Sequence, residues 1–264
     1  MMPERLSMAT QNKMVRSFYW FLAILFLYAL KQSFEAVEIS IPNLVHGLPH
    51  MWDFLQRMYP PNWSVFPRVY TEVVVTIQLA LVATTLAMFV SVPLAFLASK
   101  NVVQNLYIVR FVRFILSVDR AIDALILAMF FAAALGLGPF PGTLALAIHS
   151  VGMLGQILYQ AIENVDRKPI EAMEAVGASR LNVIRWGILP QVMPYVVSYY
   201  LLRFELNIRS AVVLGVVGAG GVGFLLQNYM KLFQYENVCV VVLTILGLVM
   251  AIDTVSTKIR SKLI

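Results

Sequence analysis

The chain is poor in cysteine and in charged residues, and both shortages narrow the possible classes of protein. Its single cysteine, Cys239, stands inside an apolar run, so no intramolecular disulfide is available and cysteine chemistry is not expected. Only 13% of the 264 residues are charged, whereas 60% are apolar. Soluble domains carry about 25% charged residues. Together with a mean hydropathy of +0.78, this composition indicates an integral membrane protein.

The chain also lacks the motifs of several enzyme classes. It has no Gly-x-x-x-x-Gly-Lys-Ser/Thr sequence for binding nucleotide phosphates, so we expect it not to hydrolyse ATP. His149 has no His or Cys at metal-ligand spacing, and no nucleophile stands in a pattern with a general base. His149 is therefore interpreted as a packed hydrogen-bonding residue rather than as a proton relay. We expect no catalytic residues, no metal and no cofactor in this chain.

Six apolar segments predict an all-α integral membrane protein with about six transmembrane helices. Lipid offers no hydrogen-bond partners to bare backbone, and the segments lack the alternation of strands, so they should be helical. The first is expected to be a retained helix behind a basic tail, with a cleaved signal peptide as the competing interpretation. The six segments are residues 17–30, 69–99, 121–137, 143–162, 193–217 and 238–254.

The segments suggest a division of the chain into three parts. Residues 1–69 would form an N-terminal cytoplasmic tail, a first transmembrane helix and a proline-rich extracytoplasmic excursion in which a continuous helix is not expected. Residues 70–258 would form the core transmembrane domain, including a loop at residues 163–190, and residues 259–264 a cytoplasmic tail.

The distribution of basic residues predicts the orientation in the membrane. Fourteen of the twenty Lys and Arg residues fall in the N-terminal tail, in the gaps at 100–120 and 163–190, and at the C-terminus. Basic residues accumulate on the cytoplasmic side. Both termini and segment 163–190 should therefore be cytoplasmic, and the pI near 9.5 reflects topology rather than binding of nucleic acid.

Segment 163–190, called the surface segment below, mixes polar and apolar residues at helical spacing. Pro169 suits a helix start, Glu171 and Glu174 favour the first turns, and Gly177 should divide the segment into two short helices. Composition alone allows an ordinary interfacial helix. The alternative is a surface that docks in a groove of another protein.

The residues of the surface segment resemble a known family. Glu171-Ala172-Met173-x-x-x-Gly177, followed by Ile188-Leu189-Pro190, is similar to the "EAA" loop of permease subunits of ATP-binding-cassette (ABC) importers. Four further runs are similar to the phosphonate transporter permeases, and the resemblance covers roughly residue 70 to the C-terminus. These runs are Gly136-Leu137-Gly138-Pro139-Phe140, Leu189-Pro190-Gln191-Val192-Met193-Pro194, Arg203-Phe204-Glu205-x-Asn207-x-Arg209-Ser210-Ala211 and Gly215-x-Val217-Gly218-Ala219-Gly220-Gly221-Val222-Gly223.

This resemblance implies a type I (MetI-like) importer permease in the bacterial cytoplasmic (inner) membrane. The cargo would be a phosphonate or a related phosphorus oxyanion such as phosphite or hypophosphite. The implied partners are a second copy of the permease, two cytoplasmic ATPase subunits that hold ATP and Mg²⁺, and an extracytoplasmic substrate-binding protein. The residues implied to contact the ATPase are Glu171, Ala172, Glu174, Gly177, Ala178, Ser179, Leu189 and Pro190. A stand-alone secondary anion transporter or channel is the competing class, in which a docking helix has no purpose.

The fifth apolar segment carries charged residues at membrane depth, where such groups usually face protein or an aqueous path. Glu205 and Arg209 stand at i,i+4 and are expected to neutralise each other. Arg203, Asn207 and Ser210 share the nearly opposite face, which is the predicted anion path. The alternative is a structural pair between Arg203 and Asp123 or Asp253.

Four glycines after this segment, Gly218, Gly220, Gly221 and Gly223, formally satisfy the dinucleotide-binding fingerprint. That fingerprint requires a parallel βαβ unit, and the chain has no strand–helix alternation. We instead predict a glycine-rich turn or re-entrant segment near the outer mouth. Close backbone packing is the preferred role, and contact of its amides with an oxyanion is the alternative.

Overall fold

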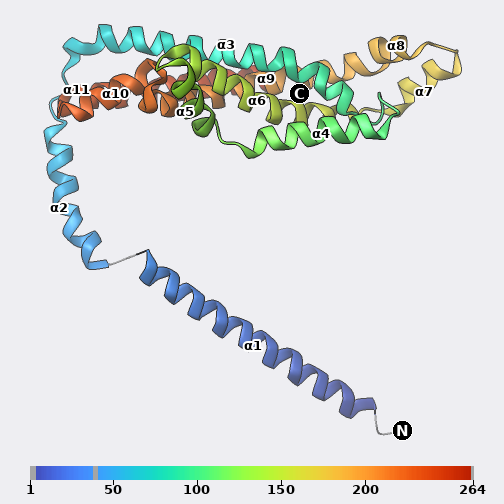
Figure 1. The fold of residues 1–264 in the computed structure, drawn as a ribbon, viewed down its shortest axis with the longest axis horizontal. Coiled ribbons are helices and arrows are strands. Elements are labelled where there is room, and N and C mark those ends of the chain that lie inside the picture. The colour runs from blue at the N-terminus through green and yellow to red at the C-terminus, as the bar shows by residue number, and fades with distance from the viewer. Residues whose placement is uncertain (1–3, 38–40, 263–264) are drawn as a thin grey trace. The chain divides into compact units, whose positions relative to one another are not determined.

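The computed structural model is built from α-helices (Figure 1). It describes residues 4–37 and 41–262, and in this part of the chain no strand occurs, as expected for the all-α class. The helices form two compact units, an N-terminal unit of residues 1–56 and a main unit of residues 57–264. The outermost residues of the two predicted tails, 1–3 and 263–264, lie outside the described residues.

The N-terminal unit contains α1 (Glu4–Ala36) and α2 (Ile41–Arg57), whose last residue belongs to the main unit. The first predicted apolar segment lies inside α1. The excursion is not one continuous helix, because α2 ends at Arg57, before Pro60 and Pro61, but α2 itself continues through Pro49. Pro42 occupies the first turn, where its missing N–H has no intrahelical partner to lose, and Pro49 removes only one backbone hydrogen bond.

Three helices of the main unit are long and apolar enough to cross a membrane among the residues described. They are α3 (Phe66–Ala98) with the short 3-10 turn before it, α6 (Pro139–Glu163) and α11 (Tyr235–Arg260). A fourth span arises if the helical stretch Arg180–Ala219 and α10 (Gly221–Lys231), which meet at 53°, count as one broken span. Three or four of the six expected spans therefore meet this criterion.

The structure corrects the sequence prediction between residues 100 and 137. The expected gap at 100–120 contains α4 (Leu106–Ala121), and the expected span at 121–137 is the shorter α5 (Ala124–Leu135). Asp123 breaks the apolar run because its carboxylate caps the start of α5 by accepting a hydrogen bond from the Leu125 N–H. Gly136, at φ 91°, ends α5.

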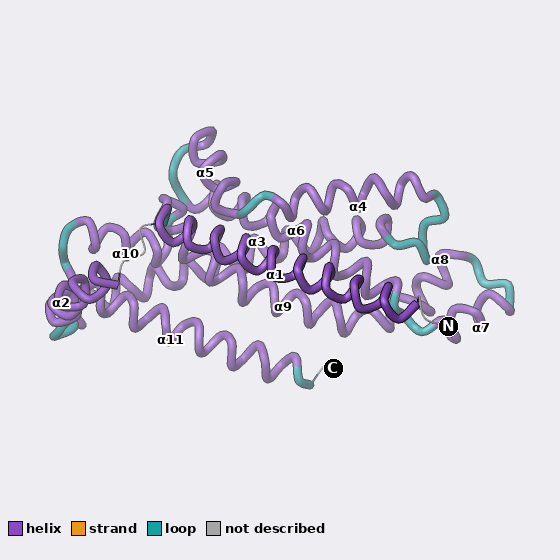
Figure 2. The backbone as a smooth tube through the Cα atoms, turned by 90° about the horizontal axis from the view of Figure 1, so that it is seen from below, coloured by secondary structure: helices purple, strands orange, loops and turns teal. Residues whose placement is uncertain are grey.

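Small residues allow the central helices of the main unit to pack closely. The buried face of α3 is rich in alanine, including Ala80, Ala83 and Ala87, and it packs against α6. A Cβ at Gly152 of α6 would lie 2.6 Å from an Asp119 carboxylate oxygen of α4. Figure 2 shows α4 running alongside α6 at this crossing. Small residues at such crossings are typical of membrane helices.

The remaining helices carry the predicted functional residues. α7 (Arg167–Ala175) and α8 (Arg180–Asn182) lie at one end of the main unit (Figure 1). A π-helical turn, Val183–Ile188, joins α8 to α9 (Leu189–Leu214), and a second one, Gly215–Ala219, follows α9. Many large apolar side chains face outward, among them Phe89, Phe114 and Phe130, as expected for a surface in contact with lipid.

Candidate functional site

The surface segment folds into two short helices separated by a glycine, as the sequence predicts. Gly177 has φ 76°, a left-handed conformation that disfavours side chains with a Cβ. The Asp166 carboxylate caps α7 by accepting from the Lys168 N–H at 3.1 Å. The Gln191 side chain exchanges hydrogen bonds with the Asp166 backbone and also donates to the Gly187 carbonyl at 2.6 Å. Gln191 thereby fixes the start of α7 to the start of α9.

The surface segment divides its apolar side chains between the protein and the solvent. Ile170 and Met173 pack toward Gly187, where a Cβ would lie 3.5 Å from the Met173 sulfur. Val176, Leu181 and Trp186 are instead 82%, 77% and 64% exposed. These three residues of the surface segment are called the apolar patch below, and the Arg185 guanidinium lies 5.4 Å from the centroid of the Trp186 ring. Exposed apolar groups of this kind mark interaction sites.

The structure places the eight predicted ATPase-contact residues in two different settings. Six of them lie between the start of α7 and the cap of α8 and are largely solvent-exposed. The other two, Leu189 and Pro190, are the first residues of α9. The exposed ones are Glu171, Ala172, Glu174, Gly177 and Ser179, and Ala178 is half-buried. The apolar patch was not among the predicted contacts, although each of its residues is an apolar residue of the predicted amphipathic segment.

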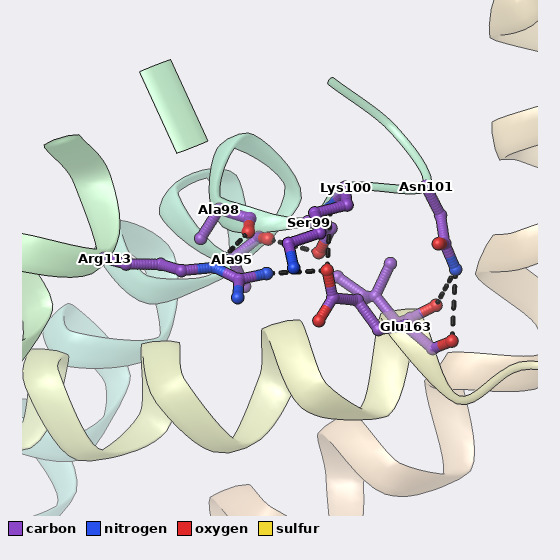
Figure 3. Close-up of polar contacts among 8 residues, drawn as sticks. Ala95, Ala98, Ser99, Lys100, Asn101, Arg113 and Glu163 are labelled. Carbon is purple, nitrogen blue, oxygen red and sulfur yellow. Dashed lines mark hydrogen bonds and ion pairs between the residues drawn. The ribbon is translucent and has the colours of Figure 1, made fainter. Parts of the chain in front are cut away.

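The last residue of α6, Glu163, joins three helices at the end of the bundle from which the surface segment leaves (Figure 3). One carboxylate oxygen accepts from the Arg113 guanidinium of α4 at 2.6 Å and from the Lys100 N–H, after α3, at 2.9 Å. Arg113 also donates to the Ala98 carbonyl at 2.9 Å and lies over the Tyr159 ring. The sequence argument missed this junction because it used Arg113 only as a topology charge.

The predicted anion face of α9 does not form one site within the protomer. Asn207 is fully buried and donates to the Thr84 and Ser150 hydroxyls of α3 and α6. Arg203 donates to the same Ser150 hydroxyl at 2.8 Å and contacts the Met153 sulfur at 2.9 Å. Arg203 makes no ion pair with Asp123, Asp253 or any other described acidic residue. Asn207 thus bonds helices together, and Ser210 lies apart from this network.

The predicted neutralisation of Glu205 is confirmed, and a second cation contributes to it. The buried Glu205 carboxylate accepts from Arg209 at 2.7 Å and from Arg260 of α11 at 3.2 Å. The Arg209 side chain is 48% exposed, so its share of the stabilisation is screened by solvent. Both Glu205 oxygens are therefore occupied in joining α9 to α11, and sequence spacing gave no indication of Arg260.

The four predicted glycines lie at the bend between the second π-helical turn and α10. Gly218, Gly220 and Gly221 have φ values of 99°, 79° and 70°, which only glycine adopts without strain. A Cβ at Gly223 would overlap the Val212 carbonyl. The Val222 N–H donates to the Thr76 hydroxyl of α3 at 2.9 Å. These contacts agree with the packing interpretation, and a role of the glycines at an outer mouth stays a prediction.

Comparisons with known proteins agree on one family. Residues 91–260 match the model of the binding-protein-dependent transport system inner membrane component. A putative phosphite transport system permease protein HtxC of Stutzerimonas stutzeri is 35% identical over 238 residues, covering 90% of this chain and 84% of that protein. The phosphate-import permease protein PhnE of Mycolicibacterium smegmatis is 36% identical over 225 residues, covering 85% of this chain and 42% of that protein.

A solved structure has the same fold as the main part of the chain. An inward-facing MetNI methionine ABC transporter superposes with a TM-score of 0.67 at 20% identity, covering 77% of this chain and 99% of that chain. At this identity the likeness concerns the fold alone, and the fold is that of a type I importer permease, as the sequence predicts.

Proposed function

Because the chain belongs to the family of binding-protein-dependent transport system inner membrane components, we propose that it is the permease of an ATP-driven importer of a phosphorus oxyanion. The chain is a transport subunit and not an enzyme, as predicted. The similarity to a phosphite permease over 90% of the chain supports phosphite, phosphonate or hypophosphite as cargo. ATP and Mg²⁺ would bind to a separate ATPase subunit, because this chain has no phosphate-binding loop.

The apolar patch on the surface segment is proposed to dock into a groove of the ATPase. Val176, Leu181 and Trp186 are exposed on a segment whose other apolar side chains, such as Ile170 and Met173, pack inward, which suits a helix laid into a groove. In this proposal the end of the bundle that carries α7 faces the cytoplasm, both termini are cytoplasmic, and a binding protein delivers cargo to the other end. A second copy of the permease would complete the path by two-fold symmetry.

The docking proposal predicts that Trp186→Ala weakens association of the permease with its ATPase. Tryptophan anchors of an interface commonly contribute 2 kcal/mol or more, so we expect the affinity to fall at least about tenfold. Trp63→Ala, which removes an exposed tryptophan in the 3-10 turn before α3, is the matched control and should bind normally. The measurement is co-purification and titration of the ATPase onto permease in nanodiscs. Equal binding by both variants would contradict docking through this patch.

Uptake into proteoliposomes tests the transport function. The permease, its ATPase and its binding protein are reconstituted together, and uptake of labelled phosphite and methylphosphonate is measured with and without ATP. ATP-dependent uptake of one of these anions is the expected result. Uptake by the purified permease alone would establish the competing secondary transporter, and an assembled complex that moves no phosphorus oxyanion would refute the proposed cargo.

A further inference from the structure

One face of α6 carries polar side chains that the buried network of α9 does not use. His149, Gln156 and Gln160 are spaced by seven and four residues and so lie along one side of the helix. With Arg120 of α4 and with Met153 and Ile157 they line a cavity of about 290 Å³. Polar groups at membrane depth normally face protein or water rather than lipid. This cavity therefore requires either an aqueous path or a covering partner.

The positive charge of Arg120 in this cavity is not neutralised by a described acidic residue. Its guanidinium donates to the Gln156 side-chain oxygen at 2.7 Å, and no ion pair of Arg120 occurs among the residues that the structure describes. The bond to a neutral amide orients the guanidinium and leaves its charge available. It also leaves the Gln156 amide hydrogens free to donate.

Arg203 supplies a second positive charge behind the wall of the same cavity. It is only 5% exposed, and one of its terminal nitrogens is buried without a hydrogen-bond partner among the described residues. Its other terminal nitrogen contacts the sulfur of Met153, which lines the cavity. A buried guanidinium nitrogen without a partner is costly unless a ligand satisfies it in some state of the protein.

The nearby carboxylates are already engaged with backbone donors. Asp119 accepts from the Gly152 N–H at 2.6 Å, and Asp123 caps α5. Both act electrostatically on His149, as does Arg203. His149 itself contacts the Ile122 carbonyl through Nδ1 at 3.0 Å. The carbonyl can only accept, so Nδ1 carries the hydrogen, and in the neutral ring Nε2 is an acceptor suited to a protonated oxygen of an oxyanion.

A second cavity shares two lining residues with this one and lies nearer the surface segment. Ile157 and Gln160 also line this larger cavity of about 530 Å³, whose wall includes Asp166 and Gln191. These last two residues fix the start of α7 to the start of α9. Gln160 thus borders both cavities, and the second cavity reaches the end of the bundle that is proposed to be cytoplasmic.

We propose that Arg120, Gln156 and His149, backed by Arg203, form a transient binding site for a small phosphorus oxyanion on the permease. The site would lie on a face of α6 completed by the second copy, with Gln160 between this cavity and the larger one. This inference rests on the proposed function, because it assigns the cargo of that function to particular side chains. It places the anion on the α4 and α6 side of Arg203 rather than on the Ser210 side of α9.

Uptake by variants in the complete reconstituted transporter tests this site. Arg120→Gln should lower the rate of labelled phosphite uptake at saturating binding protein by about tenfold or more, since a charge-assisted hydrogen bond is lost. Arg120→Lys should retain much of the rate. ATP hydrolysis stimulated by the loaded binding protein is measured on the same vesicles, as the check that each variant complex has assembled. Arg110→Gln, an exposed arginine on the same helix outside the cavity, is the matched control and should transport normally.

A second variant keeps the test decisive if Arg120→Gln fails to assemble. Gln156→Glu places a carboxylate against Arg120 and should abolish uptake in an assembled complex by neutralising the site and repelling the anion. Normal phosphite uptake by Arg120→Gln or by Gln156→Glu, with an active wild type, overturns this inference and leaves the proposed function intact. A wild type that moves no phosphorus oxyanion overturns both.

Discussion

Removing the Glu163 carboxylate should lower the stability of the main unit measurably. Its oxygen accepts from Arg113 at 2.6 Å and from the Lys100 N–H at 2.9 Å. Hydrogen bonds to charged groups contribute about 1.5–3 kcal/mol each. Both side chains of the ion pair are about one-quarter exposed, at 25% and 24%. Allowing for this screening, we expect Glu163→Ala to cost about 2 kcal/mol in total.

A cost of this size corresponds to a fall in Tm of about 4–8 °C for a chain of this length. Glu163→Gln keeps an acceptor but not the charge, and it should lose about half as much. Thermal unfolding in detergent, followed with a thiol-reactive dye, suits this chain because Cys239 is its one cysteine and is partly buried. Asp253→Asn, at an exposed residue of α11, is the control and should melt like the wild type. Equal melting of Glu163→Ala and the wild type would refute the view that this junction stabilises the bundle.

Two further substitutions test the buried contacts of the main unit. Asn207→Leu removes the hydrogen bonds to Thr84 and Ser150. Because interhelical hydrogen bonds in membranes average about 0.6 kcal/mol each, Tm should fall by about 2–4 °C while uptake is retained. Lost uptake at an unchanged Tm would instead place Asn207 in the anion path. Gly221→Ala forces a residue with a Cβ to φ 70° and places that Cβ 2.5 Å from the Thr76 hydroxyl, so we expect a cost of 2 kcal/mol or more. The control is Gly247→Ala, where a Cβ has open space and should be tolerated; equal Tm values for the two alanine variants would contradict the strain at Gly221.

The sequence predicted those features that are determined by residues close to one another along the chain. Gly177 divides the surface segment, Glu205 pairs with Arg209, and the glycines after α9 form a sharp turn, because each depends on residues within four positions. The third apolar segment was predicted to begin at residue 121, whereas α5 begins at Ala124, for a related reason. A single capping carboxylate, Asp123, outweighs the apolar character on either side of it, and hydropathy averaged over a window conceals one residue.

The pairings between helices were not predictable from one sequence. Arg113 with Glu163 and Arg260 with Glu205 join residues 50 and 55 positions apart, and spacing along the chain carries no information about such contacts. Arg203 shows the same limit. Its charge marked it as unusual, but only the packing of α9 on α6 showed that it lies behind Met153 and not on an open face.

The helical stretch from Arg180 to Ala219 has a mechanical consequence. It carries Leu181 and Trp186 of the apolar patch near its start, includes both π-helical turns, and ends at the glycine bend of 53°, with Gly218 in its last turn already outside the helical conformation. At 1.5 Å per residue the stretch is roughly 60 Å long. Tilting such a rod by about 5° displaces its far end by roughly 5 Å. A change in the tilt of this stretch relative to α10 would therefore be taken up at the glycine bend, where Gly218, Gly220 and Gly221 adopt backbone conformations that other residues reach only with strain.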